Sequence, residues 1–172
     1  MIRKGTRKDI ESIASIYEKL LDNQDQNKVT IGWIRNIYPT KDTAIEALES
    51  DELFVLEDNH QVVGAARINQ VQVPDYAKAK WEYPASDNEV MVMHTLVIDP
   101  ECSGHGYGTQ FVKFYEDYAL QHHCHYLRID TNAKNKNARA LYKKLGFKEI
   151  DIVPCIFNGI PDVQLVCLEK KI

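Results

Sequence analysis

The feature that most constrains the fold is a stretch in the middle of the chain that runs from a strand into a helix through a glycine-rich loop. Val90 to Ile98 is rich in β-branched and apolar residues, which favours a β-strand. Asp99-Pro100 ends that strand, because proline has no amide hydrogen to donate to a neighbouring strand. Gly104, Gly106 and Gly108 follow at alternate positions, and the apolar residues after them recur at helical spacing. The stretch therefore predicts a strand, a glycine loop and a helix in direct succession.

A loop of this kind can hold an anion. The first N–H groups of a helix have no partner within the helix and carry the positive end of its dipole. Glycines there leave room for a bulky ligand to approach the backbone, so a phosphate or pyrophosphate is the expected guest. A tight turn without a ligand explains the glycines equally well. The backbone amides predicted to take part are those of Gly104, His105, Gly106, Tyr107, Gly108 and Thr109, with the Thr109 hydroxyl as a further donor.

Two nucleotide-binding motifs fail to match this loop. A P-loop needs a lysine between the last glycine and the Ser or Thr, and Gly108-Thr109 has none. The dinucleotide fingerprint is Gly-x-Gly-x-x-Gly followed by an acidic residue that closes a βαβ unit, whereas the spacing here is Gly-x-Gly-x-Gly. Both interpretations are therefore disfavoured.

The loop instead resembles the coenzyme A loop of the GNAT N-acetyltransferase superfamily. The family pattern Gln/Arg-x-x-Gly-x-Gly/Ala falls on Ser103 to Gly108, with Ser103 in place of the usual Gln or Arg. A second family motif, Asn-x-x-Ala-x-x-Leu-Tyr-x-x-x-Gly-Phe, is similar to Asn135 to Phe147. The two motifs occur in the family's order, so residues 1–172 are identified as a single GNAT-type domain.

The predicted elements follow the order of that family's fold. An amphipathic helix is expected from a capping box at Thr6 to about Leu21, and a second one after Pro39-Thr40. Strands are expected at 53–57, 62–68, 89–98, 126–131, 147–152 and 163–169, with helices after the glycine loop and at 135–145. This predicts an α/β domain with a mixed, mostly antiparallel sheet of about six or seven strands flanked by four helices. The resemblance implies that the neighbouring parallel strands 89–98 and 126–131 splay apart to admit the cofactor.

Composition excludes several other functions. The 172 residues are 44% hydrophobic and 27% charged, as in ordinary soluble domains. A net charge of -4 without a basic, aromatic-lined patch argues against a nucleic-acid partner. The chain has no apolar run typical of a membrane span or signal peptide, so we expect a cytoplasmic protein without a membrane partner. The cysteines, and the sequential run His122-His123-Cys124-His125, lack metal-ligand spacing, so no metal is expected.

The resemblance implies an acetyl-CoA-dependent N-acetyltransferase that moves the acetyl group directly to a primary amine of a small molecule or protein. The alternative is a non-catalytic sensor of coenzyme A or acyl-CoA with the same fold. Transfer of a different acyl group, or acetylation of a peptide N-terminus, also remains open. Homodimers are common in this fold, so a homodimer is compatible with the resemblance.

The resemblance also implies roles for residues near the cofactor. Tyr142 matches the family tyrosine that protonates the departing coenzyme A sulfur, although packing in an amphipathic helix explains it too. Asn135 matches the asparagine that hydrogen-bonds the cofactor arm, with Asn137 as a competitor and helix capping as the other explanation for both. The acetyl and pantetheine groups are expected on the backbone of Leu96, Val97 and Ile98.

For the general base and the acceptor site, the sequence offers several candidate residues. His94 lies two residues before Leu96, so we expect the two side chains to share one face of the strand, and a histidine pKa suits deprotonation near neutral pH. Asp130 lies where some family members carry an acidic base, and Glu89 can act through water. Aromatic residues that border the acceptor site in the fold can hold an amine by cation–π contact or serve as core packing; they are Trp33, Tyr38, Trp81 and Tyr83.

Overall fold

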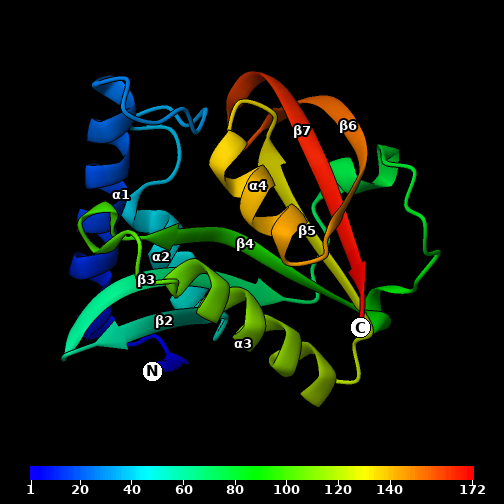
Figure 1. The fold of residues 1–172 in the computed structure, drawn as a ribbon, viewed down its shortest axis with the longest axis horizontal. Coiled ribbons are helices and arrows are strands. Elements are labelled where there is room, and N and C mark those ends of the chain that lie inside the picture. Colours follow the sequence, from blue (N-terminus) through cyan, green and yellow to red (C-terminus); the bar gives the residue numbers. More distant parts are fainter.

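Seven strands form one sheet in the computed structural model, which describes all residues from 1 to 172 (Figure 1). The strand order is β1-β2-β3-β4-β5-β7-β6, and every neighbouring pair is antiparallel except β4 and β5. The predicted mixed, mostly antiparallel sheet is therefore confirmed. The strands are β1 (Ile2–Lys4), β2 (Leu53–Asp58), β3 (Gln61–Asn69), β4 (Val90–Ile98), β5 (Tyr126–Asn132), β6 (Lys148–Phe157) and β7 (Ile160–Lys171).

Four helices cover the two faces of the sheet, as predicted. They are α1 (Ile10–Asp25), α2 (Lys41–Glu49), α3 (Tyr107–Gln121) and α4 (Lys136–Lys144). Side chains alternate along β2, so Val55 packs in the core with α1 and α2, whereas Phe54 and Leu56 pack in the core with α3 and α4. No helix has both the length and the apolar character needed to cross a membrane.

Three elements differ from the sequence prediction. Helix α1 continues to Asp25 instead of ending near Leu21, because its last turns carry Glu18, Asp22 and Asp25, which pair with Arg35 of the following loop. Strand β1 was not predicted, since three residues are too few to show a period. The last two strands are longer than predicted and form one long hairpin.

The two parallel strands separate halfway along their length. They pair from Val90 with Tyr126 to Met93 with Ile129, and the ladder ends there. Beyond this point β4 pairs only with β3, and β5 only with β7, so the strands diverge as predicted (Figure 1). The edge of β4 that faces β5 therefore lacks a strand partner after Met93.

A β-bulge lies at the point where the strands separate. The register between β3 and β4 shifts between Ala65 and Arg67, and Thr95 takes a φ of 52°, which is unusual for a β-branched residue. The extra residue changes the alternation, so Leu96 packs against the core with α3 and Val97 against the core with α1 and α2. The expectation that His94 and Leu96 share a face is therefore wrong. His94 lies beside Arg67 and Asn69 instead.

Candidate active site

Two cavities meet at the open end of the splayed strands. The α4-side cavity is bordered by Leu96, Asn135 and Tyr142 among others. The α2-side cavity is bordered by Asp42 and Glu46 of α2 and by the connection after β3. The two cavities are adjacent, because they share five lining residues, namely Tyr38, Thr95, Asp130, Phe157 and Asn158.

Asp130 of β5 lies at this junction. Its Oδ2 accepts a hydrogen bond of 2.7 Å from the Tyr76 hydroxyl, which leaves Oδ1 without a protein partner. Burial raises the pKa of Asp130 to about 6, and the hydrogen bond from Tyr76 opposes that rise. The carboxylate is therefore mainly ionised at neutral pH and is more basic than an ordinary aspartate.

His94 lines only the α2-side cavity. Its Nε2 donates to Asn69 Oδ1 at 2.9 Å, since the Asn69 amide nitrogen donates to Glu52. Burial, with the charge of Arg67, lowers the pKa of His94 to about 4, so the ring is neutral at neutral pH. Glu89, the third candidate base, lies in an exposed turn with Ser86 and lines neither cavity.

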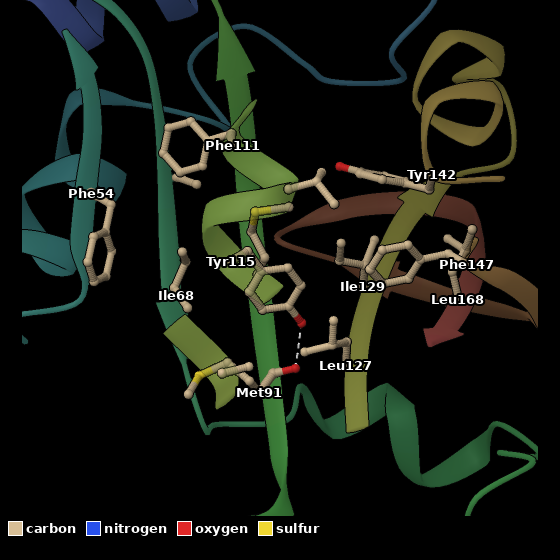
Figure 2. Close-up of a cluster of buried hydrophobic side chains, with 14 of the residues drawn as sticks. Phe54, Ile68, Met91, Phe111, Tyr115, Leu127, Ile129, Tyr142, Phe147 and Leu168 are labelled. Carbon is tan, nitrogen blue, oxygen red and sulfur yellow. Dashed lines mark hydrogen bonds between the residues drawn. The ribbon is translucent and has the colours of Figure 1, made fainter. Parts of the chain in front are cut away.

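Tyr142 is buried on α4 and borders the α4-side cavity. Its hydroxyl points from α4 across the gap toward β4 and α3 (Figure 2). The hydroxyl makes no hydrogen bond within the chain, and because no fully buried polar atom lacks a partner, this oxygen is open to the cavity. Burial raises the pKa of Tyr142, so the hydroxyl stays protonated at neutral pH. Asn135 lines the same cavity, and its Oδ1 accepts from Ala138 N at 3.1 Å. It caps α4 and keeps its amide hydrogens free for a ligand.

The parallel strands are joined below the gap by a second buried tyrosine. The Tyr115 hydroxyl of α3 lies 2.5 Å from Met91 O on β4 and 3.1 Å from Arg128 O on β5 (Figure 2). Tyr115 is fully buried. This contact ties the two strands together where they still pair, so the gap opens only beyond it.

The glycine loop is open to a ligand. Gly104 and Gly106 have φ of 85° and 75°, and no atom lies within 4 Å of the position that a Cβ would occupy at either residue. The first backbone hydrogen bond at this end of α3 runs from Gln110 N to Gly106 O, so the N–H groups before it are available. Gly108 has another role, because a Cβ there would lie 3.1 Å from Leu141 of α4.

Tyr107 is the loop side chain that packs toward the rest of the protein. His105 stacks on the ring of Tyr107, and the Tyr107 hydroxyl donates to Asp58 Oδ2 at 2.7 Å. Thr109 is exposed in the first turn of α3. Of the three β4 residues expected to contact the cofactor, Leu96 lines the α4-side cavity, and Val97 and Ile98 continue the unpaired strand edge toward the loop.

Two of the four predicted acceptor residues lie at the site. Tyr38 lines both cavities and is hydrogen-bonded through its hydroxyl to Thr95 Oγ1. Trp33 lines the α4-side cavity, with its ring edge-on to Tyr38 at a centroid distance of 6.1 Å.

The other two predicted residues, Trp81 and Tyr83, line neither cavity. Trp81 packs under the guanidinium of Arg128 at 4.0 Å and donates to Tyr76 O, and Tyr83 packs on the ring of Tyr126 at the start of β5. They anchor the connection between β3 and β4, whose middle carries Tyr76. No pattern in the sequence distinguishes Tyr76, because it lies in a stretch without periodicity.

No three His, Cys, Asp or Glu side chains come together as a metal site. In the run 122–125, His122 Nδ1 contacts Tyr118 O, and His125 Nδ1 contacts Ile172 O. Cys124 is buried between them, so the neighbours in sequence point to different partners. All four cysteines are free thiols, and none lines either cavity.

Comparisons with known sequences and structures indicate the acetyltransferase (GNAT) family. The pattern of the acetyltransferase (GNAT) family matches residues 15–147. An uncharacterized N-acetyltransferase of Methanocaldococcus jannaschii is 25% identical over 156 residues, which is 88% of this chain and 62% of that protein. A second one from the same organism is 27% identical over 77 residues, or 44% of this chain and 49% of that protein. The chain thus spans less than two thirds of the length of these relatives.

Solved structures share the fold over nearly the whole chain. A GNAT-family acetyltransferase from Streptococcus agalactiae has a TM-score of 0.80 at 19% identity, covering 100% of this chain and 95% of that one. A putative acetyltransferase from Staphylococcus aureus has a TM-score of 0.74 at 23% identity, covering 99% and 98%. A putative acetyltransferase from Salmonella typhimurium, solved with its cofactor acetyl-CoA, has a TM-score of 0.70 at 17% identity, covering 99% and 92%.

Proposed function

Because the chain belongs to the acetyltransferase (GNAT) family, we propose that it transfers an acetyl group from acetyl-CoA directly to a primary amine. One observation carries the proposal. Asp130 lines both cavities, and one of them is bordered by the cofactor-side residues Leu96, Asn135 and Tyr142. An acyl donor in the α4-side cavity and an amine in the α2-side cavity would meet at that junction.

The residues on the α4 side fit acetyl-CoA. The unpaired edge of β4 offers backbone groups to the peptide-like pantetheine arm, and the Asn135 amide offers hydrogens to it. The open amides of the glycine loop suit the pyrophosphate. When bound, acetyl-CoA supplies an acetyl group activated as a thioester. The unpartnered hydroxyl of Tyr142 is available to its leaving sulfur.

Asp130 is the proposed general base. It borders both cavities and has a free Oδ1, and its pKa of about 6 lies closer to neutral pH than the pKa of about 4 of His94. Asp130 Oδ1 takes a proton from the attacking amine as the C–N bond forms. Tyr142 gives its proton to the thiolate as the C–S bond breaks, and exchange with solvent restores both groups.

Direct transfer needs no covalent intermediate on the enzyme. A relay through cysteine would require a thiol at the junction, and no cysteine lines either cavity. The arrangement supports a ternary complex, in which both substrates are bound before the acetyl group moves.

The first test is calorimetric titration with acetyl-CoA, beside free adenosine diphosphate as a control. We expect micromolar binding of the whole cofactor, at roughly -8 kcal/mol. Release of free thiol is then measured over a broad panel of primary amines. Binding with no release on any amine would favour the sensor, and no binding would reject both functions.

A further inference from the structure

The side chain of Gln24, in the last turn of α1, holds residues 31–33, which we call the wall segment. Its Oε1 accepts hydrogen bonds from Ile31 N at 2.9 Å and Gly32 N at 2.7 Å, and its Nε2 donates to Trp33 O at 2.7 Å. All three residues of the wall segment line the α4-side cavity. A carboxamide turned the other way would set donors against donors, so these bonds fix the side chain and the segment together.

The wall segment has no other backbone support. Residues 31–33 belong to no helix or strand, and their N–H and C=O groups form no hydrogen bond with another backbone group. Ile31 is buried, so its amide needs a partner within the protein. Gln24 therefore supplies the hydrogen bonds that a neighbouring strand would otherwise provide.

The wall segment is packed closely against the site. Gly32 has a φ of 87°, and a Cβ there would lie 2.7 Å from Cγ of Asn132, which ends β5 and lines the same cavity. Trp33 lies edge-on to Tyr38 at 6.1 Å, and Tyr38 lines both cavities and is hydrogen-bonded to Thr95. A displacement of the wall segment would therefore be felt at the junction of the cavities.

We propose that Gln24 is a positioning residue for the acyl donor, although it lines neither cavity itself. It holds the wall segment so that the thioester end of acetyl-CoA is confined beside Asp130, and a small misplacement of reacting atoms costs much of the rate. The proposal rests on the proposed function. The rest of the cofactor contacts the glycine loop, β4 and Asn135 in that function, so its affinity should depend little on Gln24.

The first test is Gln24→Met, which keeps an unbranched side chain and removes all three hydrogen bonds. We expect kcat to fall by about tenfold, while the Kd for acetyl-CoA stays within about threefold. Gln26→Met is the matched control, because Gln26 is exposed one residue beyond α1 and lines neither cavity. Ile13→Ala, at a buried position of the same helix, should lower the Tm and leave kcat unchanged when it is assayed below its Tm.

The second test follows the wall segment without turnover. In a Trp81→Phe background Trp33 is the only tryptophan, and it borders the donor cavity. Saturating acetyl-CoA should shift its fluorescence emission, and Gln24→Met should lose most of that shift. Gly32→Ala displaces the wall segment from the Asn132 side with Gln24 intact, so it should lower kcat in the same way.

The outcomes separate this proposal from the proposed function. A lower Tm with unchanged kcat and an unchanged emission shift in Gln24→Met would show that Gln24 only stabilises the fold, and the acetyltransferase would stand. Acetyl-CoA binding without acetylation of any amine by the wild type would overturn the proposed function, and the role of Gln24 in catalysis with it.

Discussion

The Tyr76 hydroxyl donates a 2.7 Å hydrogen bond to Asp130 Oδ2, although the two residues are 54 positions apart. Tyr76 lies in the connection between β3 and β4, and that connection is fixed by the buried ion pair of Arg128 and Glu169. Glu169 Oε1 also accepts hydrogen bonds from the backbone of residues 82 and 83, and Trp81 donates to Tyr76 O. The connection therefore sets the position and the pKa of the proposed base.

Tyr76→Phe should move the pH profile of acetyl transfer. Burial raises the pKa of Asp130 and the Tyr76 hydrogen bond lowers it, so removing the hydroxyl should raise this pKa further. We expect the acidic limb of kcat/KM to shift upward by about one pH unit, because a hydrogen bond to a charged group contributes 1.5–3 kcal/mol by order of magnitude. His94→Gln is the control: with a pKa of about 4, His94 does not set a limb near pH 6. An unmoved limb in Tyr76→Phe would remove Asp130 as the base.

Asp130→Asn should separate stability from activity. The pKa of Asp130 in the folded chain, about 6, is raised from 3.8, so the folded state holds its proton over a pH range in which the unfolded state has lost it. The free energy of unfolding must then fall as pH rises from about 4 through 6, by a total on the order of 3 kcal/mol. Asparagine cannot ionise, so the variant should lose this slope and be at least as stable as wild type at pH 8.

Chemical denaturation of Asp130→Asn between pH 4 and 8, beside acetyl transfer at pH 8, checks this prediction. We expect a loss of turnover of about 10²-fold or more without a loss of stability. Asp117→Asn, at an exposed position on α3, should change neither quantity. A variant that is less stable than wild type at pH 8 would mean that the charged form of Asp130 supports the fold.

The elements around the candidate site that the sequence predicted correctly are those that follow from local sequence pattern. The glycine loop, the strand before it and the helix from Asn135 follow from spacing, turn residues and caps within short stretches. The splay of β4 and β5 was also predicted, but only from the family resemblance. A local sequence pattern alone does not predict where the hydrogen bonding between two strands ends.

The remaining features depend on contacts between distant residues. The bulge at Thr95 moved His94 and Leu96 to opposite faces, and no residue type marks it in the sequence. The hydrogen bond between Tyr76 and Asp130 depends on how the long connection between β3 and β4 folds back over β5 and β7. Trp81 and Tyr83 were placed at the acceptor site for their aromatic character, but cation–π and ring packing hold them against Arg128 and Tyr126.

Gly106→Val should weaken binding of acetyl-CoA by about tenfold or more, because a branched side chain would occupy the open space beside the loop amides. Gly106 also has a positive φ, so the substitution adds backbone strain. Gly146→Val is the matched control, with a φ of 87° and no part in the loop. Calorimetry should show weaker binding only in Gly106→Val, whereas thermal denaturation should show a lower Tm in both. Equal affinity in the two variants would reject the loop as the pyrophosphate site.

Tyr142→Phe should distinguish a proton donor from a packing residue. The ring is buried against Phe147 at a centroid distance of 5.9 Å, and phenylalanine keeps that contact. The hydroxyl is open to the cavity and makes no hydrogen bond in the chain, so its removal should not lower the free energy of unfolding. If the hydroxyl protonates the departing thiolate, kcat should fall by about 10²-fold, while the Kd for acetyl-CoA stays within about threefold. Wild-type turnover in Tyr142→Phe would assign the residue to the core alone, and the thiolate would then take its proton from solvent.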